Sequence, residues 1–87
     1  MRDPFTYYYP KIDIHGETSM TCVAVINSFI NDNIKLKNEN IIIIHGKGTG
    51  ILKNATYEVL KNNKNVIGFH IDPWNEGQTI IKLNIKH

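Results

Sequence analysis

A chain of 87 residues and 10.0 kDa has room for one domain, since a single hydrophobic core commonly takes about 50–200 residues. Its 41% hydrophobic and 21% charged residues are typical of a globular chain, and a net charge of +2 permits an anionic partner without demanding one. One cysteine excludes an internal disulfide framework, no apolar run nears the roughly 18 residues of a membrane span, and no secretory signal precedes Pro10, so we expect a cytoplasmic protein without a membrane partner.

The first ten residues are predicted to form an aromatic arm outside the domain, which is expected to cover residues 11–87. The arm contains Phe5 and the run Tyr7-Tyr8-Tyr9. Aromatic clusters belong to cores more often than to exposed platforms, so we expect the arm to pack on the domain. Stacking of these rings on nucleic-acid bases is the alternative.

The first half of the domain predicts a strand, a helix and a second strand. Alternation of apolar and polar residues from Ile12 to His15 indicates the first strand. Thr18 or Ser19 is suited to cap the helix that follows. The apolar residues at helical spacing are Cys22, Val25, Ile26, Phe29, Ile30 and Ile34. After a polar turn, the run Ile41–Ile44 predicts a buried strand.

The second half predicts a helix and a hairpin. The helix is expected from about Ile51 to Asn63, with its apolar side formed by Leu52, Ala55, Val59 and Leu60. Strands are expected at Val66–Asp72 and Thr79–Ile85, joined by a turn over Pro73–Gln78. The order βαβαββ implies parallel pairing across each helix and a closing hairpin. We therefore predict a two-layer α/β sandwich, a four-stranded mixed sheet with both helices on one face.

Alternation along a strand also assigns side chains to faces. Ile12 and Ile14 are expected to point toward the helices, so Asp13 and His15 lie on the open side. In the third strand, one set is expected to hold Ile67, Phe69 and Ile71, and the other His70 and Asp72.

Two histidines are expected at one rim of the sheet. His15 and His45 each end a strand that leads into a helix, and ligands of open α/β sheets gather at such carboxyl ends. Histidine is suited to general acid–base chemistry near neutral pH, and Asp13 is placed to orient an imidazole. A metal site built from Asp13, His15 and His45 is a weaker alternative, because their spacing matches no familiar zinc or magnesium pattern. The sequence requires no metal and leaves a divalent ion such as Mg²⁺ open.

The segment Gly46-Lys47-Gly48-Thr49-Gly50 lies between a strand and a helix start. Backbone amides, the positive end of the helix dipole and the Lys47 charge make this a sound anion site. The spacing matches neither GxxxxGK[ST] nor GxGxxG. A tight turn without ligand is the alternative, and we favour binding of a nucleic-acid backbone phosphate.

Three further features have weaker implications. Cys22 on the apolar helix face is expected in the core rather than as a nucleophile. Trp74 is either an exposed anchor, a base-stacking platform or a cover for the sheet edge. His70 and Lys82 either extend a positive open face or are simply solvated.

Two motifs resemble the Smr (small MutS-related) domain family. Ile12-Asp13-Ile14-His15-Gly16 resembles the family's opening Leu-Asp-x-His-Gly, and residues 45–50 match its HGKGTG motif without a change. Supporting positions, which extend the resemblance over residues 11–85, include Thr18, Leu52, Lys53, Val59, Val66, Phe69 and Thr79. The segment 75–79 departs from the family's glycine-rich turn and adds a negative charge.

The resemblance implies a βαβαββ domain, nucleic-acid binding and, in many members, endonuclease or nicking activity. Carried over to this chain, Asp13 and His15 would be the cleavage residues, and the motif at 45–50 would bind the nucleic-acid backbone. We therefore expect a small stand-alone endonuclease acting on RNA or DNA, with His45 as the counterpart of His15 in proton transfer.

Two other functions stay open: a non-catalytic nucleic-acid or ribosome-binding module, and a mononucleotide-binding protein. The sequence does not distinguish RNA from DNA, and it leaves the oligomeric state and any targeting protein partner open.

Overall fold

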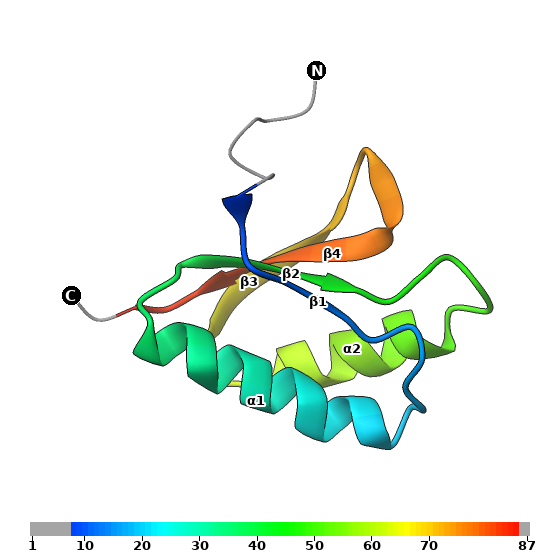
Figure 1. Cartoon of the computed structure of the whole chain (residues 1–87), viewed down its shortest axis with the longest axis horizontal. Coiled ribbons are helices and arrows are strands. Elements are labelled where there is room, and N and C mark those ends of the chain that lie inside the picture. The colour runs from blue at the N-terminus through cyan, green and yellow to red at the C-terminus, as the bar shows by residue number, and fades with distance from the viewer. Residues whose placement is uncertain (1–7, 86–87) are drawn as a thin grey trace.

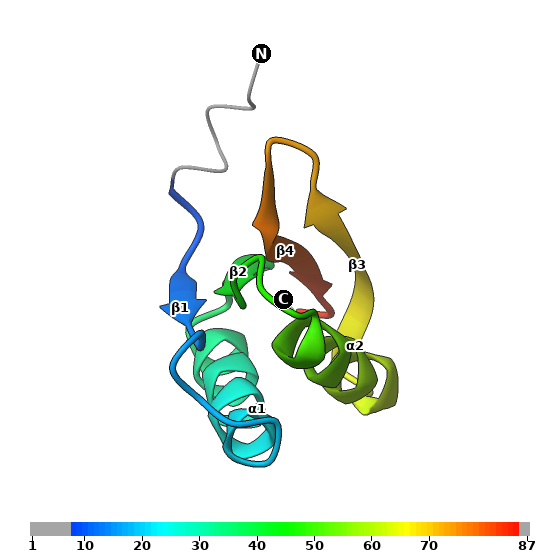
Figure 2. The same ribbon diagram turned by 90° about the vertical axis from the view of Figure 1, so that its right-hand side faces the viewer.

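The computed structural model describes residues 8–85. Its sheet has the strand order β1-β2-β4-β3, with β1 parallel to β2 and β4 antiparallel to both of its neighbours. Both helices lie side by side on one face of this sheet (Figure 1 and Figure 2). The predicted two-layer sandwich is confirmed, with elements β1 Lys11–Asp13, α1 Thr21–Lys35, β2 Asn40–Ile44, α2 Ile51–Asn62, β3 Val66–Asp72 and β4 Asn75–Leu83.

The core lies between the sheet and the helices. Ile41 and Ile43 face the helices from β2, and Ile81 lies beside Ile41 on β4; all three are fully buried. Helix α1 packs the predicted apolar face against them, with Cys22, Ile26 and Ile30 buried and Val25, Phe29 and Ile34 partly buried. No helix among residues 8–85 combines the length and the apolar character that crossing a bilayer requires.

Helix α1 is closed at both ends by local hydrogen bonds. At its start, Thr21 N donates to Thr18 Oγ1 at 3.0 Å and Thr18 N donates to Thr21 Oγ1 at 3.0 Å. Thr18 thus closes the turn that leads into the helix, while Met20, which precedes Thr21, makes no side-chain capping bond. At its end, Lys37 N donates to Ile34 O and Asn38 N donates to Asn33 O, the two bonds of a Schellman motif. Lys37 takes the left-handed position of that motif, with φ of 61°.

Two details of the hairpin correct the sequence prediction. Strand β4 begins at Asn75 instead of Thr79, so the connection is the short Pro73-Trp74 segment rather than the whole of 73–78. Ile67 does not share a buried face with Phe69: it is 61% exposed, because the register shifts between Val66 and Gly68. Such a bulge moves one residue out of the alternation.

Three chain connections gather at one end of the molecule. Strands β1, β2 and β3 run in the same direction, since β4 is antiparallel to β2 and to β3. Their carboxyl ends lead into residues 14–20 and the loop at 45–50, on the right in Figure 1, and into the hairpin tip at 73–74, at the top and right of the centre. The expected rim therefore exists. Of the predicted aromatic arm, Phe5 and Tyr7 lie outside the described residues, and Tyr8 is 85% exposed.

Candidate functional site

Asp13 and His15 form a hydrogen-bonded pair at the end of β1. Asp13 Oδ1 accepts the backbone N–H of His15 at 3.0 Å and lies 2.5 Å from His15 Nδ1. The side chains are 49% and 70% exposed, so the pair faces solvent. The backbone N–H of His15, and then its ring, hold the pKa of Asp13 below its ordinary value of 3.8. Asp13 therefore stays a carboxylate that orients the His15 ring.

The loop that joins β2 to α2 needs glycine at two positions. Gly46 and Gly50 have φ of 83° and 85°, a left-handed conformation that side chains rarely adopt. Lys47, Gly48 and Thr49 between them are exposed. The loop leads directly into the N-terminus of α2, where Ile51 N has only a long 3.4 Å contact to Thr49 Oγ1. Amides at this helix start are directed at the loop.

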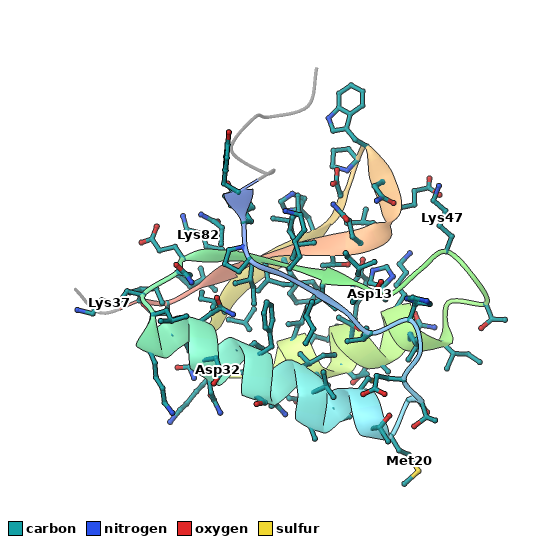
Figure 3. All side chains as sticks on the ribbon, viewed as in Figure 1. Asp13, Met20, Asp32, Lys37, Lys47 and Lys82 are labelled. Atoms are coloured by element: carbon teal, nitrogen blue, oxygen red, sulfur yellow. The ribbon has the colours of Figure 1, made fainter. Side chains whose placement is uncertain are left out.

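His15 of the pair and the glycine loop line one cavity. It measures about 410 Å³ and is lined by His15, His45, Gly46, Lys47, Gly48, Thr49, Gly50, Ile51, Leu52 and Lys53. A Cβ atom added to Gly46 would lie 3.6 Å from His15 Cβ, so the two motifs lie next to each other. Asp13 and Lys47, labelled in Figure 3, lie at the same end of the sheet. The two sequence motifs, some thirty residues apart, thus line a single site.

His45 lies beneath the loop rather than beside the solvent. It is 4% exposed; its Nδ1 lies 3.0 Å from Gly46 O and its Nε2 lies 2.9 Å from Thr79 Oγ1. A carbonyl only accepts, so Nδ1 carries the proton and Nε2 accepts from the threonine hydroxyl. Burial lowers the pKa of His45 below 6.5, as does the Lys53 charge, against an opposing contribution from the Gly46 carbonyl. Both ring nitrogens are engaged, which does not fit the expected exchange of protons with a substrate.

Strand β4 contributes two groups that sequence reasoning did not assign to the site. Gly77 O accepts the backbone N–H groups of His45 and Gly46, each at 2.9 Å, and Thr79 holds the His45 ring. A Cβ atom on Gly77 would lie 3.4 Å from Lys47 Cγ and 3.5 Å from Gly46 C. In the sequence, the signal for this role was limited to Gly77 in the predicted turn and Thr79 at the start of the predicted strand.

The remaining candidate residues considered in the sequence analysis do not line this cavity. Cys22 is buried in the core, as predicted, and burial raises the pKa of its thiol. Trp74 is 61% exposed at the hairpin tip, and His70 and Lys82 are exposed on the sheet. Within residues 8–85, no three histidine, cysteine, aspartate or glutamate side chains are grouped to hold a metal ion.

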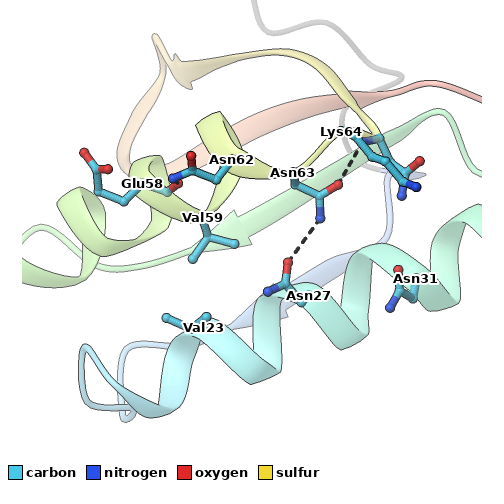
Figure 4. A pocket seen from close by; sticks show the side chains of 9 residues that line it. Val23, Asn27, Asn31, Glu58, Val59, Asn62, Asn63 and Lys64 are labelled. Atoms are coloured by element: carbon cyan, nitrogen blue, oxygen red, sulfur yellow. Dashed lines mark hydrogen bonds between the residues drawn. The ribbon is translucent and has the colours of Figure 1, made fainter.

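A larger hollow, of about 530 Å³, lies between the helices away from the loop (Figure 4). Its walls are mainly asparagines, of which Asn63 Nδ2 donates to Asn27 Oδ1 at 3.1 Å and Asn63 Oδ1 accepts from Asn65 N at 2.9 Å. The Asn63 side chain is thus hydrogen-bonded through both its nitrogen and its oxygen within the hollow. The larger volume therefore does not mark the functional site, and we assign the site to the smaller cavity, which is lined by His15 and the glycine loop.

Comparison with known proteins identifies the family. A family model described as the Smr domain matches residues 12–83. The chain belongs to the Smr domain family. It is 34% identical over 73 residues to the endonuclease MutS2 of Helicobacter pylori, a match covering 84% of this chain and 10% of that protein. It is 38% identical over 69 residues to the endonuclease MutS2 of Thermotoga petrophila, a match covering 79% of this chain and 9% of that protein.

Solved structures agree with this assignment. The Smr domain of Thermus thermophilus MutS2 superimposes with a TM-score of 0.82 at 27% identity, covering 85% of this chain and 96% of that one. YdaL, a stand-alone small MutS-related protein from Escherichia coli, superimposes with a TM-score of 0.81 at 21% identity. This match covers 86% of this chain and 66% of YdaL, and it shows a shared fold. This Smr domain spans about a tenth of the length of the MutS2 relatives it matches.

Proposed function

We propose that this Smr domain is a nucleic-acid-binding endonuclease that holds a backbone phosphate at the loop 45–50 and cleaves with the Asp13–His15 pair. The observation that carries the proposal is the proximity of the two motifs. His15 lines the same cavity as the glycine loop, and a Cβ on Gly46 would lie 3.6 Å from His15 Cβ. The name endonuclease MutS2, borne by longer relatives, agrees with this chemistry.

Phosphate binding is supported by the charges and amides around the loop. Lys47 is exposed on the loop, and Lys53 follows on the first turn of α2 within the cavity lining. A helix N-terminus with a lysine nearby stabilises an anion through its N–H groups and dipole. Gly48 presents its backbone without a Cβ atom, and nothing lies within 4 Å of the place a Cβ would take. A phosphate can therefore approach the backbone closely.

Cleavage is assigned to His15, with Asp13 as its orienting partner. The Asp13 carboxylate on Nδ1 favours the tautomer with its proton there, which leaves Nε2 free to accept one. In RNA, Nε2 takes the proton of a ribose 2′-hydroxyl; that oxygen bonds to phosphorus, the bond to the 5′-oxygen breaks, and solvent protonates the leaving oxygen. In DNA, Nε2 activates a water molecule instead. The products distinguish these routes, since the first leaves a cyclic phosphate.

His45 has a supporting role in this proposal. Its ring is hydrogen-bonded on both sides, to Gly46 O and to Thr79 Oγ1, and it is nearly fully buried. We assign it to holding the loop in its binding conformation. Proton transfer is thereby left to His15.

The alternative is a non-catalytic nucleic-acid or ribosome-binding module. The small net charge of +2 favours it, since weak backbone attraction leaves most affinity to a partner surface. The name endonuclease also belongs to proteins of which this chain spans about a tenth. A cytoplasmic setting is part of either proposal and is supported by the buried free thiol of Cys22.

Cleavage of an end-labelled structured RNA and of a matching DNA tests the proposal, each with and without added Mg²⁺. Asp13→Ala/His15→Ala, purified in parallel, serves as the contamination control. We expect cleavage by the wild type alone, and inhibition by a 2′-deoxy substitution at the cut if the 2′-hydroxyl is the nucleophile. Binding without cleavage under all conditions would favour the alternative. Equal cleavage by both proteins would refute the assignment of these residues.

A further inference from the structure

Trp74 is an exposed aromatic side chain without a ring partner in residues 8–85. It is the single tryptophan of the chain and is 61% exposed at the tip of the β3–β4 hairpin. Within that same range, the aromatic pair with its rings in contact is Tyr57–Phe69, at 5.2 Å. An indole offers a large flat surface, and the packing of the described residues makes little use of it.

The backbone beneath Trp74 is fixed by a buried carboxylate. Asp72, 1% exposed, accepts the backbone N–H of Trp74 at 2.8 Å through Oδ1 and Gln78 Nε2 at 2.7 Å through Oδ2. Gln78 is itself 3% exposed. The Asp72 carboxylate on β3 thus holds the two-residue turn through a part-buried bond to Trp74 N and is itself held to β4 by a buried bond from Gln78. A ring on such a turn loses little backbone freedom when it binds a partner.

The hairpin is also tied to the glycine loop. Gly77, three residues after Trp74, accepts the N–H groups of His45 and Gly46 at 2.9 Å each. A strand rises about 3.3 Å per residue, so the Trp74 backbone lies about 10 Å from Gly77. Stacked nucleotides rise about 3.4 Å each, and this distance corresponds to about three of them. A Cβ atom on Gly77 would also lie 3.4 Å from Lys47 Cγ, so strand β4 and the glycine loop lie side by side just below the hairpin tip, which is at the top of Figure 2.

We propose that Trp74 is a stacking platform for an unpaired base about three nucleotides from the phosphate held at the loop. This inference rests on the proposed nucleic-acid binding and specifies its substrate as single-stranded or unpaired at that position. A base inside a duplex is already stacked and cannot use the ring. Of its neighbours along the chain, Asn75 and the exposed Glu76 are polar and the exposed Pro73 is the apolar one, which falls short of the apolar surroundings of a protein-binding hot spot. The exposed Glu76 carboxylate repels a phosphate chain and the exposed Lys47 attracts one, so we place the phosphate chain beside Lys47.

Because Trp74 is the single tryptophan, intrinsic fluorescence reports on it directly. The probes are a single-stranded RNA decamer, the same sequence as a duplex, and inorganic polyphosphate, which carries charge without bases. We expect the single strand to quench the tryptophan emission and polyphosphate to leave it unchanged while competing for the loop. Anisotropy of the labelled decamer measures affinity independently, and Trp74→Ala is expected to weaken it about tenfold with polyphosphate binding retained. Trp74→Phe should restore part of that affinity.

Each contrary result has its own meaning. Decamer binding by anisotropy without quenching, or with an unchanged Trp74→Ala affinity, overturns stacking and leaves the proposed function standing. No binding of any probe overturns the proposed function and this inference together. Self-association of the wild type that Trp74→Ala abolishes, with decamer affinity unaltered, would assign the ring to a protein interface and also overturn stacking. Trp74→Phe provides the same comparison if the alanine variant folds poorly.

Discussion

His45 Nε2 and Thr79 Oγ1 lie 2.9 Å apart in the interior, although 34 residues separate them along the chain. Their bond joins the end of β2 to the middle of β4, directly under the glycine loop. His45 Nδ1 also binds Gly46 O. His45 and Thr79 therefore fix the start of the loop to the sheet. We regard this bond as the support on which the proposed phosphate site depends.

Thr79→Val is expected to destabilise the domain by about 1–3 kcal/mol, because it leaves a buried imidazole nitrogen without its donor. RNA affinity should fall as well, since the loop loses its support. Thr56→Val is the matched control: Thr56 is equally buried, but its hydroxyl donates to Leu52 O at 2.7 Å within α2. Urea unfolding and RNA titration of both variants check this. Equal affinities for the two variants would contradict the supporting role of Thr79.

Stability is expected to fall on the acid side through His45. Its folded pKa lies below the ordinary 6.5, so the unfolded chain binds the extra proton first as the pH drops. The contribution of neutral His45 to the free energy of unfolding is complete well above pH 6.5. It declines as the pH falls below that value and is lost at the folded pKa. His45→Asn retains a donor near Gly46 O and removes the titration. Urea unfolding between about pH 7.5 and 5.5, a range that brackets the ordinary histidine pKa of about 6.5, measures the free energy of unfolding. This free energy should change less with pH in the variant than in the wild type. Identical slopes would be inconsistent with a buried neutral His45.

Gly48→Ala separates binding from folding. Nothing lies within 4 Å of the new Cβ and its φ is ordinary, so the unfolding free energy should change by less than about 0.5 kcal/mol. RNA affinity should nevertheless fall roughly tenfold, because the methyl group displaces a charged phosphate from a backbone donor. Gly46→Ala should instead cost about 1–2 kcal/mol of stability, because its φ is 83°. Unchanged affinity in Gly48→Ala would exclude close phosphate approach at that position.

Lys37→Gly is expected to stabilise the domain by about 1 kcal/mol, since glycine adopts the left-handed conformation without steric cost. Lys37 has φ of 61° at the end of α1, where the Schellman bonds fix it. The melting temperature should rise by about 4–8 °C. Cleavage should stay the same, because Lys37 is not in the cavity lining. A lower melting temperature would argue against strain at this residue.

The fold was predictable because its periodicities are local. The isoleucines of β2 and the spacing in α1 indicate their buried faces directly, and the parallel strand ends then place Asp13 and His15 near the loop. The start of β4 at Asn75 was not predictable, because Asn75 and Gln78 take their place through the buried Asp72. Nor was the exposure of Ile67, which depends on a bulge.

The gathering of His15, His45 and the glycine loop at one rim was predictable, but the different exposure of the two histidines was not. His15 and His45 follow strands in the same way, and alternation cannot tell which one meets solvent. That difference comes from Thr79 and Gly77, which reach His45 from a distant strand. Long-range partners of this kind leave no periodic trace in a sequence.

The central claim is that one site binds with the loop and cleaves with the Asp13–His15 pair. Single-turnover cleavage at saturating protein, measured beside RNA affinity for Asp13→Asn and Lys47→Ala, tests it most directly. For Asp13→Asn we predict a cleavage rate at least about 100-fold lower with affinity nearly unchanged. Lys47→Ala should weaken affinity and reduce the salt dependence of binding by about one phosphate contact, with cleavage of bound RNA largely retained. Wild-type cleavage by Asp13→Asn, at equal affinity, would contradict the account.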